Sequence, residues 1–309
     1  MRHIGSAVAV FLVPVFALAQ DVEVAASISF TEGPTVDRNG DLYFTDIASQ
    51  RILKLDTEGV LSTFRDNSNA ANGLLIDAEG RLVACEGARF TRPGVLVQGT
   101  PRVTRTNLES GEMEVLADSY EGQPLSGPND VTMDGQGRLY FTDPAGRAVY
   151  RIDAPGQIER ILDADDLERP NGIQVSPDDT TLYVVEANGE ENGARMIRAF
   201  DLQPDGTVRN MRVHYDFYPG RSADGMSIDT AGNLYAAAGL HQLRGTSETL
   251  DTKPGVHVIS PAGELLSYIP IPEDTVTNTA FGGPEMRTLY VTAGKTVFRF
   301  ETDVPGLPR

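Results

Sequence analysis

The chain has 309 residues, with 44 acidic side chains against 26 Lys or Arg, and a formal net charge of −18 at pH 7. Nucleic acids and anionic membrane surfaces attract basic patches, so this acidity argues against both as partners. The single cysteine, Cys85, has no second thiol in the chain to pair with. Because it lies in the strand-like run 82–86, we expect it to be a small buried hydrophobic residue.

The first 19 residues have the features of a secretory signal peptide. A basic start at Arg2 is followed by the apolar run 4–19, which ends on the small-residue cleavage pattern of residues 17–19. A membrane span needs about 20 apolar residues, and this run is shorter and interrupted by Pro14. We therefore expect cleavage near Ala19 and export of the mature chain to a periplasm or the outside, without membrane insertion.

From residue 20 onward, one sequence phrase returns six times. Each copy opens on a polar residue and passes through a short apolar run and a turn, in most copies of Asp-x-x-Gly type. A second run follows, often beginning Leu-Tyr. The opening residues are Glu32, Asn72, Asn129, Asn171, Asp224 and Asn278. A third strand-like run follows in each copy, at residues 51–55, 103–106, 149–152, 196–200, 256–259 and 297–300.

A repeat of roughly 40 to 55 residues made of short strands is typical of propeller blades. Most copies add a fourth strand, so the sequence predicts an all-β fold, a six-bladed β-propeller with four-stranded antiparallel blades, in a single domain over residues 20–309. The last copy stops near Glu301 after three strands. We expect the run 22–29 to supply the fourth strand and close the ring. An open β-solenoid also repeats, but its rungs are usually shorter and it would not need this extra strand.

The six opening residues are all carboxylates or amides. In a propeller the first strand of each blade lines the central channel, so these oxygens are expected at one mouth of it. Each alone could simply cap a turn, and for Asn72 and Asn278 both interpretations stay open. Glu caps turns poorly, so Glu32 together with Asn171 and Asp224 favours a cation site instead. Hard oxygen ligands suit Ca²⁺ best, with Mg²⁺, Mn²⁺ or Zn²⁺ as the other candidates.

Loops of unequal length follow the second strands and are expected around the same mouth. The longest are residues 87–102 and 239–254, and long loops gathered on one face commonly carry function. His241, in the second of these loops beside Arg244, is the titratable side chain expected to lie nearest Asp224 and to contact substrate or relay a proton. Four acids end second strands at this rim and are expected to be mainly solvated turn residues, with one or two free to contact substrate: Asp46, Glu86, Asp143 and Glu186.

The opening residues and their flanks resemble the SMP-30/gluconolactonase/luciferin-regenerating-enzyme family over nearly the whole mature chain. The most specific stretches are Glu32-Gly33-Pro34, Asn72-Gly73-Leu74, 80–86, 126–131, 140–144, Pro170-Asn171-Gly172, Asp224-Gly225 and 281–284. The resemblance implies a calcium-dependent six-bladed propeller in which Glu32, Asn171 and Asp224 bind the metal and Asp224 is also the general acid or base. It places Asn129 near the metal, touching substrate or a metal-bound water.

One position departs from part of this family. Regucalcin-like sugar lactonases carry an Arg two residues before the Asn that matches Asn129, and this chain has Gly127 there. Their substrate is therefore not carried over.

The function expected from the sequence is hydrolysis of a lactone, a sugar lactone or a related ester. A divalent cation would polarise the carbonyl and Asp224 would handle the proton. No Gly-x-Ser-x-Gly motif is present, so a serine-hydrolase mechanism has no support. Two alternatives stay open: a phosphotriesterase-like hydrolase on the same metal site, and a non-catalytic sugar- or partner-binding propeller with a structural ion.

Overall fold

The computed structural model describes residues 23–27, 29–92 and 95–308. The signal peptide predicted for residues 1–19 lies outside these ranges. Over the described residues the chain forms 28 β-strands and one short 3₁₀ helix, η1 (Pro284–Met286). No helix in this part of the chain is long and apolar enough to cross a membrane.

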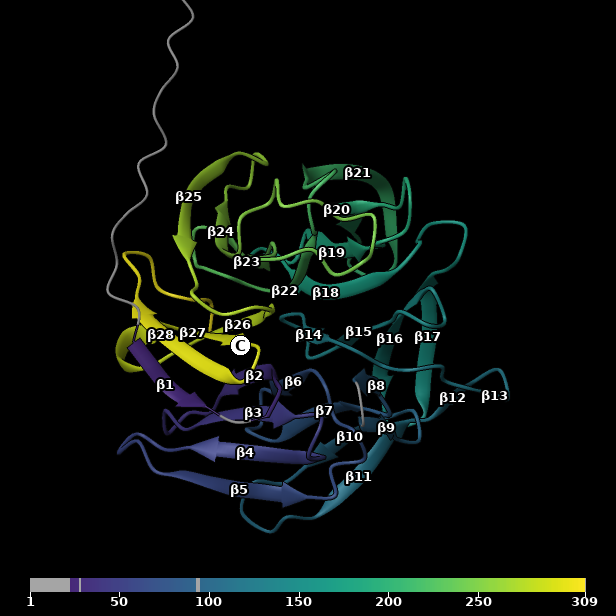
Figure 1. Ribbon diagram of the computed structural model, residues 1–309. Helices are drawn as coiled ribbons and strands as arrows, with labels where there is room; N and C mark the ends of the chain where they lie inside the picture. Colours follow the sequence, from purple (N-terminus) through teal and green to yellow (C-terminus); the bar gives the residue numbers. More distant parts are fainter. Residues whose placement is uncertain (1–22, 28, 93–94, 309) are drawn as a thin grey trace, which may run out of the picture.

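Six four-stranded antiparallel sheets stand around a central channel (Figure 1), which confirms the predicted six-bladed propeller. The innermost strands are β2 (Thr31–Val36), β6 (Leu74–Ile76), β14 (Val131–Met133), β18 (Pro170–Val175), β22 (Ala223–Ile228) and β26 (Val276–Gly282). The second strands are β3 (Leu42–Asp46), β7 (Leu82–Glu86), β15 (Leu139–Asp143), β19 (Thr181–Ala187), β23 (Leu234–Ala238) and β27 (Thr288–Ala293). The third strands are β4 (Arg51–Leu55), β10 (Arg102–Thr106), β16 (Ala148–Ala154), β20 (Arg195–Leu202), β24 (Gly255–Ile259) and β28 (Thr296–Glu301). The outer strands of blades one to five are β5 (Leu61–Asp66), β11 (Met113–Ala117), β17 (Gln157–Leu162), β21 (Val208–Asp216) and β25 (Leu265–Pro270).

The outer strand of blade six comes from the other end of the chain. β1 (Glu23–Ser27) pairs antiparallel with β28, with Glu23 opposite Arg299 and Ser27 opposite Thr296. The sheet order β1-β28-β27-β26 confirms that the N-terminal strand closes the ring, as predicted from the run 22–29. A closed ring of this kind removes the free sheet edges that an open solenoid would leave.

Two small hairpins stand outside the blades. The predicted long loop after β7 contains a hairpin of its own, β8 (Arg89–Arg92) with β9 (Val95–Gln98). A second hairpin, β12 (Ser119–Tyr120) with β13 (Gln123–Pro124), precedes blade three.

The recurring Asp of the sequence phrase builds the turn between the first two strands of a blade. In blade two, Asp77 Oδ1 accepts the backbone N–H groups of Glu79 (3.0 Å) and Arg81 (2.8 Å), and Gly80 takes a left-handed φ of +79°. Asp37, Asp134 and Asp229 make the same pair of bonds in their blades. A short Asp side chain and a glycine without Cβ are what this turn requires.

Apolar side chains of neighbouring blades pack against one another. Both β3 and β15 read Leu-Tyr-Phe-Thr-Asp, and all five residues of each are buried. One apolar cluster joins Tyr235 and Val256 of blade five to Phe281 and Phe298 of blade six. Burial of such surface stabilises the fold by about 25 cal/mol per Å². The packing between blades therefore holds the innermost strands in position around the channel.

Candidate metal and active site

Glycines let the opening residues crowd together at one mouth of the channel. In four blades the opening residue is followed by glycine, and a Cβ on that glycine would lie less than 3.0 Å from the opening residue of the next blade. The pairs are Gly33 with Asn72, Gly73 with Asn129, Gly172 with Asp224, and Gly225 with Asn278. The Asn-Gly and Asp-Gly phrases of the sequence thus reflect close approach between blades.

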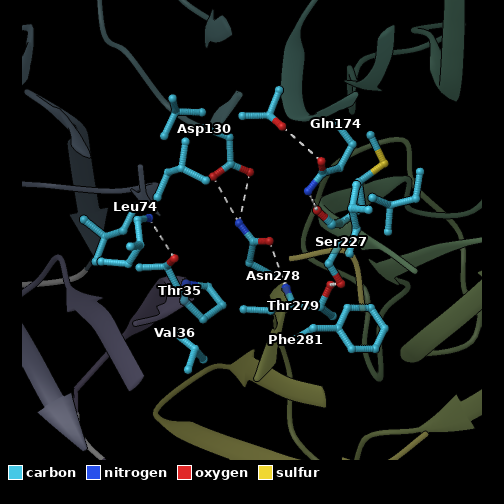
Figure 2. A pocket seen from close by; sticks show the side chains of 18 of the residues that line it. Thr35, Val36, Leu74, Asp130, Gln174, Ser227, Asn278, Thr279 and Phe281 are labelled. Atoms are coloured by element: carbon cyan, nitrogen blue, oxygen red, sulfur yellow. Dashed lines mark hydrogen bonds between the residues drawn. The ribbon is translucent and has the colours of Figure 1, made fainter. Parts of the chain in front are cut away.

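Blade three has Asp130, and blade six has Thr279, where the other four blades have this glycine. The Asp130 carboxylate points into the channel, where Asn278 Nδ2 donates to Oδ1 (3.1 Å) and Oδ2 (3.0 Å), as Figure 2 shows. Asn278 Oδ1 also accepts the backbone N–H of Thr279 (2.8 Å), so this residue both caps its own strand and reaches into the channel. Asp130 was missed from the sequence, although its departure from the glycine pattern was a signal.

Asp224 is held by two donors. Asn171 Nδ2 donates to Oδ1 (2.5 Å), and the Arg221 guanidinium forms an ion pair with Oδ2. Nη1 of Arg221 donates to the backbone carbonyl of Val276 (3.1 Å) and, more weakly, to that of Gly239 (3.5 Å). The structure therefore brings Asn171 and Asp224 together, as predicted, and adds Arg221, which sequence reasoning missed.

Glu32 is buried in the same charge cluster. Its Oε2 accepts the backbone N–H of Gly33 (2.9 Å). Burial, and then the negative charges of Asp224 and Asp130, raise the pKa of Glu32 well above its usual range. Burial and the charge of Asp224 raise the pKa of Asp130 to about 7. Neighbouring like charges disfavour one another's ionised form, and a cation bound among them would offset this repulsion.

The donor atoms suit a hard divalent cation. Glu32 and Asp224 supply carboxylate oxygens, and Asn171, which uses its amide nitrogen on Asp224, has its side-chain oxygen available. No group of three or more His, Cys, Asp or Glu side chains in the described ranges is arranged to hold a metal. The set predicted here needs only two carboxylates with amide oxygens, and oxygen ligands are the ones Ca²⁺ prefers. The residues present therefore fit the ion expected from the sequence.

Asn129 and Asn72 join the ring of opening residues through their backbones. Gly73 N–H donates to the Asn129 carbonyl (2.8 Å), and Thr45 Oγ1 donates to the Asn72 carbonyl (3.1 Å). Asn72 is buried, whereas Asn129 is half-buried. Their contacts with substrate stay a prediction.

The other groups around the mouth differ from expectation. The side-chain partners of Asp224 are Asn171 and Arg221, whereas His241 is exposed and its Nε2 lies 2.8 Å from the backbone oxygen of Ile271. Whether His241 touches substrate stays a prediction. Arg244, in the same loop, forms an ion pair with Asp274 (3.4 Å).

The sequence suggested that the four acids at the rim, Asp46, Glu86, Asp143 and Glu186, are mainly solvated turn residues. This prediction is wrong, because all four are fully buried. Each accepts hydrogen bonds from the segment that leads into its own blade. The donors are Phe30 N–H to Asp46 (3.2 Å), Asn69 Nδ2 to Glu86 (3.0 Å), Ser126 N–H to Asp143 (2.8 Å) and Arg169 N–H to Glu186 (2.7 Å). These carboxylates therefore fasten the strand entrances of blades one to four.

A buried arginine organises the loops of blades four and five. Arg195 is 1% exposed, and its guanidinium donates to four backbone carbonyls. They belong to Asn188 (3.1 Å), Glu190 (2.7 Å), Pro219 (2.8 Å) and Ser247 (3.2 Å). Arg195 thereby ties three separate connections together at this face.

At the far mouth of the channel, the ends of the innermost strands meet the segment 306–308. Leu307 N–H donates to Ile228 O (3.1 Å) at the end of β22, and Gly306 N–H donates to Met286 O (2.7 Å). A cavity of about 200 Å³ (Figure 2) is lined by Asp130, Asn278 and Leu307, among others. Of the three clustered carboxylates, Asp130 therefore also borders this cavity.

Comparison with known proteins adds to this geometry. A family model described as "SMP-30/Gluconolactonase/LRE-like region" matches residues 30–295. The gluconolactonase of Zymomonas mobilis is 27% identical over 92% of this chain and 81% of its own length. The diisopropyl-fluorophosphatase of Loligo vulgaris is 26% identical over 90% of this chain and 91% of its own. The structure of a gluconolactonase from Xanthomonas campestris superimposes with a TM-score of 0.73, at 27% identity, over 92% of this chain and 89% of that one.

Proposed function

Since this chain belongs to the SMP-30/gluconolactonase/LRE-like family, we propose that it hydrolyses a lactone, a sugar lactone or a related ester, with a divalent cation as cofactor. The observation that carries the proposal is the hydrogen bond between Asn171 and Asp224, from two different blades, at the mouth that the long loops surround, with the buried Glu32 near enough to interact electrostatically with Asp224. Gluconolactonases are among the relatives of this chain. Ca²⁺ is the ion that this donor set favours.

The bound cation would supply Lewis-acid polarisation of the lactone carbonyl. Glu32, Asn171 and Asp224 would hold it through their side-chain oxygens. Asn129, at the same ring, would orient the substrate or the attacking water.

Asp224 has the position and charge of a general base. The ion pair with Arg221 and the hydrogen bond from Asn171 hold its carboxylate in place at the channel mouth. One of its oxygens accepts a proton as water adds to the carbonyl carbon. When the ring C–O bond breaks, the same proton goes to the departing alkoxide, and the product is the open hydroxy acid. Such proton transfer typically contributes 10²–10⁴-fold, as an order of magnitude.

The test is a lactone panel with the purified mature chain and added Ca²⁺, Mg²⁺, Mn²⁺ or Zn²⁺. We expect hydrolysis that a chelator abolishes and that Asp224→Asn lowers by roughly 10²-fold or more. Asp165→Asn, the same change at an exposed site, should keep full activity. Unchanged turnover by Asp224→Asn on a confirmed substrate would remove Asp224 from the mechanism, and a chain that binds sugars or a cation without hydrolysis would be a non-catalytic propeller.

The match to a diisopropyl-fluorophosphatase supports one second candidate, a phosphotriesterase-like activity at the same site. A polarised P=O group and a water poised for attack need the same cation and the same base as a lactone carbonyl. Parallel assays of lactones and phosphofluoridates, each with and without chelator, separate the two activities by their kcat/KM values.

We also propose that the chain is exported after cleavage near Ala19, on the signal-peptide pattern of residues 1–19. Mass spectrometry of the protein from a periplasmic or culture fraction should give a mature N-terminus near Gln20. Full-length protein confined to the cytosolic fraction would contradict export.

A further inference from the structure

Arg221 is held rigidly beside the carboxylate cluster. It lies in the connection between β21 and β22, three residues before Asp224, and it is 8% exposed. Its Nη1 is tied to Val276 O at the start of β26 and to Gly239 O just after β23, and its Nη2 bonds Asp224 Oδ2. Two backbone carbonyls and one carboxylate thus fix the guanidinium between blades five and six.

The formal charges of the cluster determine the charge of the cation that would neutralise it. Glu32, Asp130 and Asp224 carry three negative charges when ionised. Arg221 contributes one positive charge through its ion pair with Asp224. Two negative charges remain, which is the charge that one divalent cation neutralises.

Arg244 is the other guanidinium near Asp224, and its role differs. Burial and the charge of Arg221 lower its pKa. It forms an ion pair with Asp274 at 3.4 Å and a hydrogen bond with Thr275, on the loop before β26 and at its edge. Its charge is therefore offset by its own carboxylate, and the ion pair that Asp224 makes is with Arg221.

We propose that Arg221 is a permanent part of the cation site, where it orients the Asp224 carboxylate and sets the net charge of the cluster to match a divalent ion. The inference rests on the proposed function only in requiring that a cation binds at this cluster. Arg221 is a positioning residue: it acts through Asp224 and through charge. A planar guanidinium suits this role because Nη1 can donate to backbone carbonyls while Nη2 donates to a carboxylate.

The test compares a divalent with a trivalent ion of similar size, Ca²⁺ and La³⁺, by isothermal titration calorimetry. Loss of one positive charge should favour the ion of higher charge, so in Arg221→Met the affinity for La³⁺ relative to Ca²⁺ should rise by roughly tenfold or more. A variant that merely displaces Asp224 weakens the binding of both ions together and leaves this ratio unchanged. The ratio therefore separates a charge role from a purely structural one.

Two further variants complete the experiment. Arg221→Lys keeps the positive charge but loses the planar set of guanidinium donors. It should therefore bind both ions more weakly, while its ratio of La³⁺ to Ca²⁺ affinity stays near that of the wild type. Arg212→Met removes one charge from an exposed site on blade four, and should change neither affinity. Circular dichroism and thermal melting confirm that each variant is folded.

The outcomes are distinct. A wild-type chain that binds neither ion would overturn the proposed function and this inference together. Binding by the wild type with the same ratio in Arg221→Met would overturn this inference alone, as would an equal change of ratio in Arg221→Lys. A raised ratio in Arg221→Met, with the wild-type ratio in Arg221→Lys, supports it.

Discussion

Asn278 reaches across the channel from blade six and donates its amide to both carboxylate oxygens of Asp130 in blade three, 148 residues away in the sequence. Asp130 is 8% exposed, so this amide replaces much of the water that its carboxylate would otherwise bind. The bond therefore joins opposite sides of the ring.

Asn278→Leu should destabilise the fold, because Asp130 would remain buried without its donor. A hydrogen bond to a charged group of this kind contributes about 1.5–3 kcal/mol, and we expect a loss of that size in the free energy of unfolding, measured by urea denaturation with a chelator present. The double variant Asp130→Leu/Asn278→Leu should recover most of the loss, since neither polar group remains. A single variant as stable as the wild type would contradict the importance of this bond.

Gly225→Ala should disturb the mouth of the channel. The new Cβ would fall less than 3.0 Å from the Asn278 side chain, so this side chain must shift and strain its hydrogen bonds with Asp130 and Thr279. Forced overpacking of this kind typically costs about 1–3 kcal/mol, and we expect a lower melting temperature together with weaker cation binding. Gly127→Ala is the matched control: its Cβ would meet no atom within 4 Å, and stability should not change by more than about 0.5 kcal/mol. Equal effects at both positions would show that close approach is not the cause.

Arg195→Met should loosen the loops of blades four and five. Four backbone carbonyls would lose a shared donor, and we expect a loss of roughly 3 kcal/mol in the free energy of unfolding. Hydrogen exchange followed by mass spectrometry should show faster exchange in residues 187–194, 217–222 and 239–254. The exposed Arg212→Met serves as control and should leave exchange in these segments unchanged. If the loops exchange at the wild-type rate in Arg195→Met, then Arg195 does not organise them.

His257 should make stability fall on mild acidification. Burial lowers its pKa below the usual value of 6.5, and its Nε2 bonds Lys253 O (2.9 Å). Below pH 6.5 the unfolded chain takes up a proton at this residue that the folded chain resists, so stability is complete above that pH and declines as the pH drops toward the lowered folded value. Comparison with His257→Gln by urea denaturation at pH 7.5, 6.5 and 5.5 isolates this contribution. The wild type should lose more stability than the variant over this range, and parallel curves would contradict the prediction.

Periodic features of the sequence were enough to predict the architecture. The repeated phrase specified six blades, and the shortfall of one strand in the last copy specified closure by the run 22–29, because both depend only on strand count and order. The meeting of Glu32, Asn171 and Asp224 follows from the same periodicity, since each begins an innermost strand.

Groups whose role depends on tertiary packing could not be found this way. Arg221 precedes its strand, and its direction is set by the carbonyls of Gly239 and Val276 in two other segments, which no local pattern encodes. The four rim acids look like turn residues in sequence, yet the entering segment of each blade folds over them and supplies their donors. Asp130 was within reach of sequence reasoning, because an acidic residue stands there where four of the other five opening phrases have glycine.

Because β1 pairs with β28, closure of the ring depends on chain segments about 270 residues apart. Glu23 and Arg299, which face each other in this pair, are separated by 276 positions. During synthesis or translocation, blades one to five can assemble as their strands appear, but β1 has no partner until β28 has emerged. Contacts of such long range carry a large entropic cost and form late. Joining the ring is therefore expected to be the last step of maturation, and the seam between β1 and β28 the place where unfolding under force or heat begins.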